Sequence, residues 1–359
     1  MNPDTRNWPW LLKSGLTPIN HISDERYPKI SIITPSYNQG QYLEETIHSV
    51  ILQNYPNYEL LIIDAGSTDT TLDVIRKYEP WITHWVSEPD RGQSHAIQKG
   101  LALATGDIIN WINSDDLVAP GAFHRIATEF NLEKYDVICG KCDYFLDSLD
   151  QLDLRDMRMG LGPTVGDTLA WPKINQPSTF FKAAVLKELG IDERFRYTMD
   201  VDLWYRYLLR AGQSRVLLSE GLLTYFRLHG ASKSVAESAG FEGEVWVVYY
   251  NVLYSTHQAA VLLDFARQAI PVILPFSPTR YEVRVAPAEL RAFVRHVAWL
   301  GLHHYNEQGN YAAARQCLTI ARRHGQPLDA TVLRQLVKHY LLPKSLVRWF
   351  ATRSSNPAS

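Results

Sequence analysis

The first half of the chain alternates short apolar runs with segments in which apolar residues recur every three or four positions. The apolar runs, rich in β-branched residues, predict strands over residues 29–34, 59–64, 81–86 and 108–113. Between them, the spacing of Leu43, Ile47 and Val50 is typical of one face of a helix, and similar patterns recur twice more. Strands and helices that alternate at such short intervals predict an α/β fold with a doubly wound, mostly parallel sheet flanked by helices.

The pattern changes after residue 116. Short helices are predicted over 119–129, 183–189 and 202–209, and short strands over 136–140, 142–145, 215–218 and 221–228. Residues 150–178 are rich in Gly, Pro, Asp and Met and predict a long loop, which inside a domain is usually functional. From about residue 240 the pattern is helical, and 306–325 predict a helical hairpin with its turn at Gly309. We therefore expect an extension over 1–27, an α/β domain over 28–238 and a helical C-terminal region over 239–359.

Composition excludes several classes of protein. At 359 residues and 46% hydrophobic content, the chain has room for about two globular domains. The net charge of −2 argues against a nucleic-acid-binding surface. Three cysteines are too few for a disulfide framework, and the Cys139-x-x-Cys142 pair has only Cys317 as a further thiol, so neither disulfides nor a zinc site is expected.

The length of the apolar runs predicts where the protein is located. No run of 18 apolar residues predicts a membrane-spanning helix, and residues 1–27 have no apolar signal core, so we expect a cytoplasmic protein. Residues 331–353 form a basic amphipathic segment that leaves two alternatives open. The segment either contacts the inner face of an anionic membrane or packs on the protein body with its basic face in water.

Two adjacent carboxylates, Asp115 and Asp116, directly follow the predicted strand 108–113. In an open α/β sheet, ligands bind in the crevice beyond the carboxyl ends of the strands. A pair of acids in that crevice indicates a divalent cation, and a cation there indicates a phosphorylated substrate. The alternative is that both aspartates cap the following turn or helix.

Four segments together resemble a known family. They are 34–38 (TPSYN), 64–69 (DAGSTD), 88–93 (EPDRGQ) and 113–116 (NSDD). In this order and at this spacing they resemble glycosyltransferase family two over roughly residues 28–235. The resemblance implies a GT-A fold, a nucleotide-sugar donor and inversion at the anomeric carbon. It also implies a nucleotide-sugar-binding half over 28–116 and an acceptor-binding half over 117–238.

The resemblance also implies roles for single residues. Donor contacts are expected at Thr34, Pro35, Tyr37, Asp64, Asp90, Gln93 and Asp115. Many relatives carry a second acid after Asp64, where this chain has Ala65, so recognition of uridine stays open. Asp116 is expected to ligate Mn²⁺ or Mg²⁺ with Asp115 as a helper. His229 is expected to contact the metal or the diphosphate, and a structural histidine is the alternative.

The acceptor side needs a base that takes the proton of the attacking hydroxyl. Asp200 matches the family's catalytic base, although Met199 replaces the usual glutamate beside it. Asp202 is the alternative base, or else a helix cap. Trp204 is expected either to form a platform for an acceptor sugar or to lie in the core, and Gln176 is expected to line the acceptor pocket.

These features predict an inverting glycosyltransferase that moves a sugar from a nucleotide-sugar donor, expected to be UDP-linked, to a hydroxyl of a glycan or lipid-linked acceptor. Two alternatives are a nucleotide-sugar or glycan binding protein of the same fold and a glycoside hydrolase, which also uses two carboxylates. A hydrolase would not explain motifs that end successive strands. Replacement of Asp200 or Asp116 would have favoured a binding protein, and both are present.

Overall fold

The computed structural model of the chain describes residues 26–146, 149, 152–153, 160–229, 238–272, 274 and 276–341. The expected extension over 1–27 lies outside the described residues, apart from its last two residues. So do residues 150–151 and 154–159 of the predicted long loop and the end of the basic segment from 342 onward. The chain divides into two compact units. Unit 1 consists of residues 1–160, 173–207 and 213–241, and unit 2 of residues 161–172, 208–212 and 242–359.

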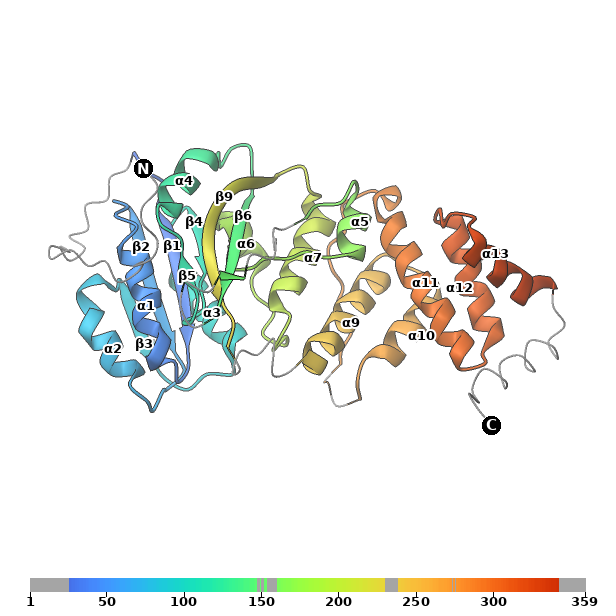
Figure 1. The fold of residues 1–359 in the computed structure, drawn as a ribbon, viewed down its shortest axis with the longest axis horizontal. Helices are drawn as coiled ribbons and strands as arrows, with labels where there is room; N and C mark the ends of the chain where they lie inside the picture. Colours follow the sequence, from blue (N-terminus) through green and yellow to red (C-terminus); the bar gives the residue numbers. More distant parts are fainter. Residues whose placement is uncertain are drawn as a thin grey trace. The chain divides into compact units, whose positions relative to one another are not determined.

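Unit 1 is built around one sheet, to which nine strands contribute within the described residues (Figure 1). The strands are β1 (Ile30–Ser36), β2 (Tyr58–Asp64), β3 (His84–Ser87), β4 (Ile108–Trp111), β5 (Leu117–Val118), β6 (Val137–Phe145), β7 (Leu152–Asp153), β8 (Thr179–Lys182) and β9 (Val216–Arg227). Their order is β3-β2-β1-β4-β8-β6-β9-β5, with β7 paired to β6. The first four strands are parallel, as predicted. The second half is mixed, because β8 runs antiparallel to both β4 and β6.

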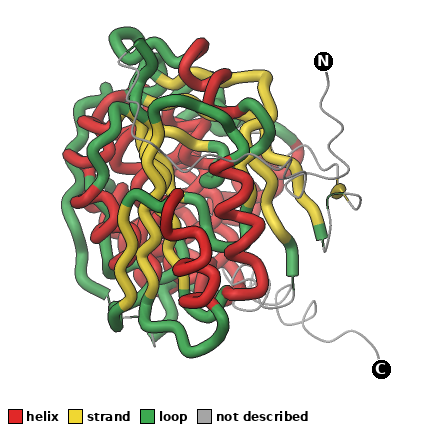
Figure 2. Tube along the Cα trace, turned by 90° about the vertical axis from the view of Figure 1, so that its left-hand side faces the viewer, coloured by secondary structure: helices red, strands yellow, loops and turns green. Residues whose placement is uncertain are grey.

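Helices cover both faces of this sheet (Figure 2). They are α1 (Gly40–Ile51), α2 (Thr71–Tyr78), α3 (Gln93–Leu103), α4 (Ala122–Glu129), α6 (Ala183–Leu189) and α7 (Met199–Ala211), whose last residues belong to unit 2. A 3₁₀ turn, η2 (Glu79–Trp81), precedes β3, which therefore starts three residues later than the apolar pattern predicted.

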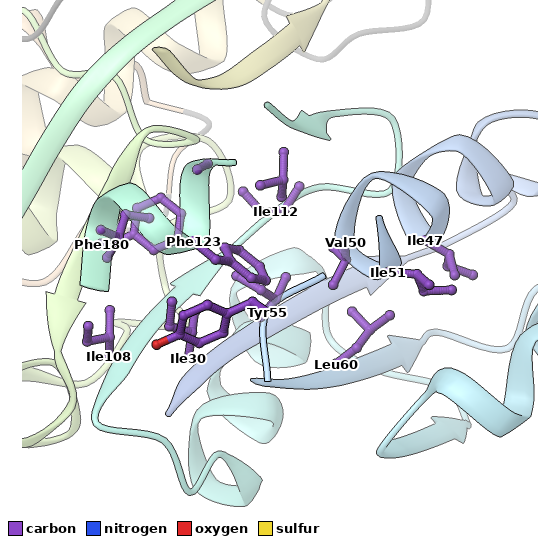
Figure 3. Close-up of a cluster of buried hydrophobic side chains, with 14 of the residues drawn as sticks. Ile30, Ile47, Val50, Ile51, Tyr55, Leu60, Ile108, Ile112, Phe123 and Phe180 are labelled. Atoms are coloured by element: carbon purple, nitrogen blue, oxygen red, sulfur yellow. The ribbon is translucent and has the colours of Figure 1, made fainter. Parts of the chain in front are cut away.

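The alternation of side chains along β1 explains the two layers of helices. Ile30 packs in a core cluster with Ile47 of α1 and Phe123 of α4 (Figure 3). On the other face, Ile33 meets α3, where a Cβ on Gly100 would lie 2.3 Å from Ile33 Cγ2. The glycine therefore lets α3 approach the sheet closely, as the doubly wound fold requires.

Two pairs of predicted short strands are each one continuous strand. Residues 136–140 and 142–145 form β6, and residues 215–218 and 221–228 form β9. Gly140, at the end of the first predicted strand, allows a close approach of β6 and β9, since a Cβ there would lie 2.4 Å from Leu223 Cγ.

Unit 2 is helical. It contains α5 (Val165–Ala170), α9 (Ser238–Ser255), which starts in unit 1, α10 (Ala260–Ala269), η3 (Pro287–Leu290), α11 (Arg291–Glu307), α12 (Tyr311–Arg323), α13 (Ala330–Leu336) and η4 (Val337–Leu341). The predicted hairpin segment 306–325 contains the last two residues of α11, a turn and all of α12. The Asn310 side chain caps α12 by accepting from the backbone N–H of Ala313. The predicted long loop contains α5, which has a capping box of Thr164 and Asp167. Among the helices of the described chain, none has the length and apolar content to span a membrane.

Candidate functional site

The sheet topology brings the ends of distant strands to one edge. β1, β2 and β4 are parallel, so their carboxyl ends lie together. β8 is antiparallel to β4, β6 is antiparallel to β8, and β9 is parallel to β6. β9 therefore runs parallel to β4 and ends at the same edge, which places Arg227 and His229 next to the Asp115-Asp116 turn.

Asp116 is fully buried. Its Oδ1 accepts from the backbone N–H of Arg227 at 3.1 Å and its Oδ2 accepts from Asn113 Nδ2 at 3.1 Å. Its backbone carbonyl accepts from Thr46 Oγ1 at 2.9 Å. Burial, together with the neighbouring charge of Asp115, raises the pKa of the Asp116 carboxyl well above its ordinary value. Asp116 thus holds the turn together from inside the protein.

Asp115 and His229 form a second pair that is closer to the surface. Asp115 Oδ2 lies 2.9 Å from His229 Nε2, and the two side chains are 19% and 9% exposed. The ring of Tyr42 in α1 packs against the imidazole, with 4.8 Å between ring centroids. A carboxylate oxygen and an imidazole nitrogen this close are two groups that can share a cation, provided that a substrate phosphate and water complete its coordination.

No cluster of three His, Cys, Asp or Glu side chains suited to a metal occurs in the described part of the chain. Mg²⁺ and similar hard cations often bind through only one or two carboxylates plus substrate phosphates. The residues at this edge fit that mode rather than a cage made entirely of protein ligands.

Asp64, one of the predicted donor residues, holds together the loops that follow β1, β2 and β3. It is fully buried, and its carboxylate accepts from the backbone N–H of Ser67 at 2.9 Å and from Ser87 Oγ at 2.5 Å. Ser67 Oγ in turn accepts from the backbone N–H of Asn38 at 2.7 Å. Asp64 is therefore linked through Ser67 to the loop after β1, where Tyr37 is 60% exposed.

The other predicted donor residues differ in exposure. Thr34 and Pro35 lie buried within β1, and Thr34 Oγ1 has no hydrogen-bond partner among the described residues. Asp90 is half-buried and accepts from the backbone N–H of Gly92 at 2.7 Å. Gln93, the first residue of α3, donates from Nε2 to Asn113 Oδ1 at 2.7 Å. Gln93 is thereby joined to the turn that carries the two aspartates.

The first two turns of α3 also contact the segment before α7. Ser94 Oγ donates to the backbone carbonyl of Phe195, and Ile191 N donates to Gln98 Oε1 at 2.9 Å. These bonds hold the start of α7, which carries Asp200, beside the helix that begins at Gln93. The structure thus links the predicted base through α3 to the sheet edge that carries the two aspartates.

Asp202 and Asp200 are in different environments. Asp202 is fully buried and accepts from Arg206 Nε at 2.7 Å. Arg206 also donates to the carbonyls of Leu189 and Gly190, at 2.5 and 2.9 Å. Asp202 is therefore part of a buried ion pair that fixes α7, whereas Asp200 is half-buried in the first helical turn.

The predicted acceptor residues have structural partners. Trp204 is 1% exposed and packs against Phe181 and Tyr207, with ring centroids 5.7 and 5.8 Å away. This packing fits the core role that the sequence left open and gives no support to a platform for a sugar. Gln176 donates from Nε2 to the carbonyl of Trp111 at 2.7 Å, so it supports the end of β4.

Sequence reasoning missed Arg227 and Glu45. Arg227 contacts the Asp115-Asp116 turn directly, since its Nε donates to the carbonyl of Asp115 at 3.0 Å. Glu45 forms an ion pair with the Arg227 guanidinium. Proximity to His229 was a signal for Arg227. Glu45 gave none, because a glutamate in an amphipathic helix usually faces water.

Comparisons with known proteins bear on this geometry. Residues 31–189 match the family described as "Glycosyl transferase family 2". The uncharacterized glycosyltransferase RT0329 of Rickettsia typhi is 29% identical over 216 residues, which are 57% of this chain and 65% of that protein. A Bacillus subtilis glycosyltransferase, TuaG, whose name assigns it provisionally to teichuronic acid biosynthesis, is 40% identical over 92 residues, 25% of this chain and 36% of that protein. The chain therefore spans less than two thirds of the length of either relative.

A solved structure shares the fold. The crystal structure of S. aureus TarS 1-349 aligns with a TM-score of 0.52 and 16% identity, and the alignment covers 92% of this chain and 93% of that one. The same protein has also been crystallised in complex with UDP-GlcNAc.

Proposed function

Because this chain belongs to glycosyl transferase family 2, we propose that it transfers a sugar from a nucleoside-diphosphate sugar to a hydroxyl of a glycan or lipid-linked acceptor, with inversion at the anomeric carbon. One observation carries the proposal. The Asp115 carboxylate and the His229 imidazole meet, 2.9 Å apart, at the carboxyl edge of the parallel strands, where α/β folds bind their ligands.

The donor is expected to lie along this edge from Tyr37 to His229. The exposed ring of Tyr37 offers a stacking surface for a nucleobase. The complex of TarS 1-349 with UDP-GlcNAc makes a UDP-sugar the first donor to test. Asp64 is occupied with the protein's own donors, so base recognition would depend on Tyr37 and on the backbone of the loops that Asp64 supports.

We assign the divalent cation, Mn²⁺ or Mg²⁺, to Asp115 and His229 rather than to Asp116 as the family resemblance implied. Asp116 is fully buried, and both of its oxygens already accept hydrogen bonds from the protein. When bound, the cation would neutralise the charge that develops on the leaving diphosphate.

On the acceptor side, Asp200 would take the proton of the hydroxyl as its oxygen attacks the anomeric carbon and the bond to the diphosphate breaks. Asp202 is a poorer base because Arg206 pairs with it in the interior. The provisional assignment of TuaG to teichuronic acid biosynthesis supports a precursor of teichuronic acid as an acceptor to try first. Contact of the basic C-terminal segment with a membrane stays a prediction of the sequence, since the segment lies outside the described residues from 342 onward.

The test is nucleotide release from a panel of UDP-, GDP- and dTDP-sugars, with and without Mn²⁺. Wild type should release one nucleotide far faster with the metal present. Asp200→Asn should lower kcat by ~10²–10⁴-fold, the usual contribution of a general base. Metal-independent turnover, or full activity of Asp200→Asn, would contradict the mechanism. Tight donor binding without release in the presence of acceptors would point instead to a binding protein.

A further inference from the structure

We propose that Arg227 is a positioning residue: with Glu45 of α1 as its partner, it holds the Asp115-Asp116 turn in the conformation that binds the divalent cation. The inference rests on the cation site of the proposed function. It adds two residues that do not themselves ligate the cation but set how tightly it binds.

Arg227 holds both aspartates by different groups. Its backbone N–H donates to the Asp116 carboxylate at 3.1 Å, and its side-chain Nε donates to the Asp115 backbone carbonyl at 3.0 Å. Arg227 also lies two residues before His229, whose Nε2 is 2.9 Å from the Asp115 carboxylate. One residue therefore holds the Asp115 backbone and also begins the short segment that carries His229, the other group expected to ligate the cation.

The Arg227 guanidinium is almost completely buried, at 3% exposure. It forms an ion pair with Glu45 and lies over the rings of Tyr42 and Phe145, 4.8 and 4.4 Å from their centroids. A planar, delocalised cation can stack on aromatic rings and donate in several directions at once. A lysine ammonium cannot reproduce these contacts together, so Arg227→Lys tests the geometry while it keeps the charge.

One face of α1 supports the whole turn. Tyr42, Glu45, Thr46 and Ser49 follow one another at the i, i+3, i+4 and i+7 positions of a single helical face. Tyr42 contacts both His229 and Arg227, and Thr46 Oγ1 donates to the Asp116 carbonyl. Ser49 Oγ accepts from the backbone N–H of Val118, just after the turn. Glu45 is the charged member of this face, and it anchors the Arg227 side chain to α1.

This arrangement predicts a specific kinetic signature. Without the contacts of the Arg227 guanidinium, the Asp115 backbone loses a donor and the spacing between Asp115 and His229 is less well fixed. The affinity for the cation should fall, whereas Asp200, on α7, should be unaffected. The Mn²⁺ concentration for half-maximal activity should therefore rise, while kcat at saturating Mn²⁺ stays near that of wild type.

The decisive experiment measures Mn²⁺ binding directly, from the electron paramagnetic resonance signal of free Mn²⁺ in titrations with UDP present. Arg227→Lys and Glu45→Gln should each bind Mn²⁺ about tenfold more weakly, as is usual when a group behind a metal ligand is changed. Arg215→Lys is the matched control. Arg215 precedes the other end of the twelve-residue strand β9 and also pairs with an aspartate, Asp136, at 2.8 Å, so this variant should bind like wild type.

Thermal unfolding shows whether each variant is folded, and Glu45→Gln carries the test if Arg227→Lys does not fold. Wild-type affinity in the folded Arg227 and Glu45 variants, with binding lost in Asp115→Asn, would overturn this inference alone. A wild-type protein that binds no Mn²⁺ would overturn the cation site of the proposed function, and this inference with it.

Discussion

Asp200 and Asp202 stand two residues apart in the first turn of α7, and the structure predicts opposite consequences when each is changed to asparagine. Asp200→Asn should abolish most of the catalytic rate and leave the fold intact. Asp202→Asn should weaken the fold and leave most of the catalytic rate intact. The same chemical change in one helical turn makes each variant the control for the other.

The magnitudes follow from the environments of the two carboxylates. Removing one partner of a buried ion pair costs about 3–5 kcal/mol. Arg206 keeps two backbone carbonyls as acceptors after the change, so we expect about 3 kcal/mol for Asp202→Asn. That corresponds to a fall in Tm of roughly 6–12 °C. Asp200→Asn should change stability by less than about 1 kcal/mol, the usual effect of one charge at a helix N-terminus, while the barrier to reaction rises by roughly 3–5 kcal/mol.

Thermal unfolding and nucleotide release, measured on the same preparations below the lowest Tm, separate the two effects. A folded Asp202→Asn protein that has lost a hundredfold in kcat, beside an active Asp200→Asn protein, would assign the base to Asp202. It would also show that the buried pair with Arg206 opens during catalysis, contrary to our reasoning.

Three further predictions concern the body of unit 1. Trp204→Ala should lower the free energy of unfolding, measured in urea, by about 3–5 kcal/mol and leave the KM for the acceptor unchanged. A raised KM with little loss of stability would instead support Trp204 as a platform for an acceptor sugar. Gly100→Ala should cost about 1–3 kcal/mol in the same assay, because the new Cβ would meet Ile33 at 2.3 Å; an unchanged urea midpoint would contradict that packing. Burial lowers the pKa of His48 below its ordinary value of 6.5, so the native state binds fewer protons than the unfolded chain and stability should fall as the pH drops below about 6.5. His48→Gln should flatten the pH dependence of the free energy of unfolding between pH 7.5 and 5.5. An equally steep slope in the variant would show that His48 is not its source.

Much of the sheet over residues 28–116 could be predicted from sequence, because its signals are local. The strands that end at Ser36, Asp64 and Trp111 consist mostly of apolar residues, as expected for parallel strands buried on both faces. Polar residues that follow such runs must meet at one edge of the sheet. The proximity of the loop after β1 to the Asp115-Asp116 turn follows from that rule alone.

Which of Asp115 and Asp116 has the buried side chain could not be predicted in the same way. The two residues are adjacent and chemically identical, and which one points inward depends on the backbone N–H of Arg227, which lies 111 positions further along the chain. Pairing of this kind between distant segments leaves no local pattern. The burial of Trp204 is similar, since it depends on Phe181 of β8, a short strand that the sequence did not reveal.

The sheet order also has a consequence for the synthesis of the protein. β1 to β4 come from one continuous stretch between Ile30 and Trp111, so they can pair soon after they leave the ribosome. Arg227 emerges about 5–20 s after Asp116 at ordinary rates of translation. Until then the nascent chain holds two neighbouring aspartates with neither the Arg227 donor nor His229 beside them. We expect residues 28–116 to fold first and the contacts of Arg227 and His229 with the Asp115-Asp116 turn to form last, as a slow, non-local step of folding.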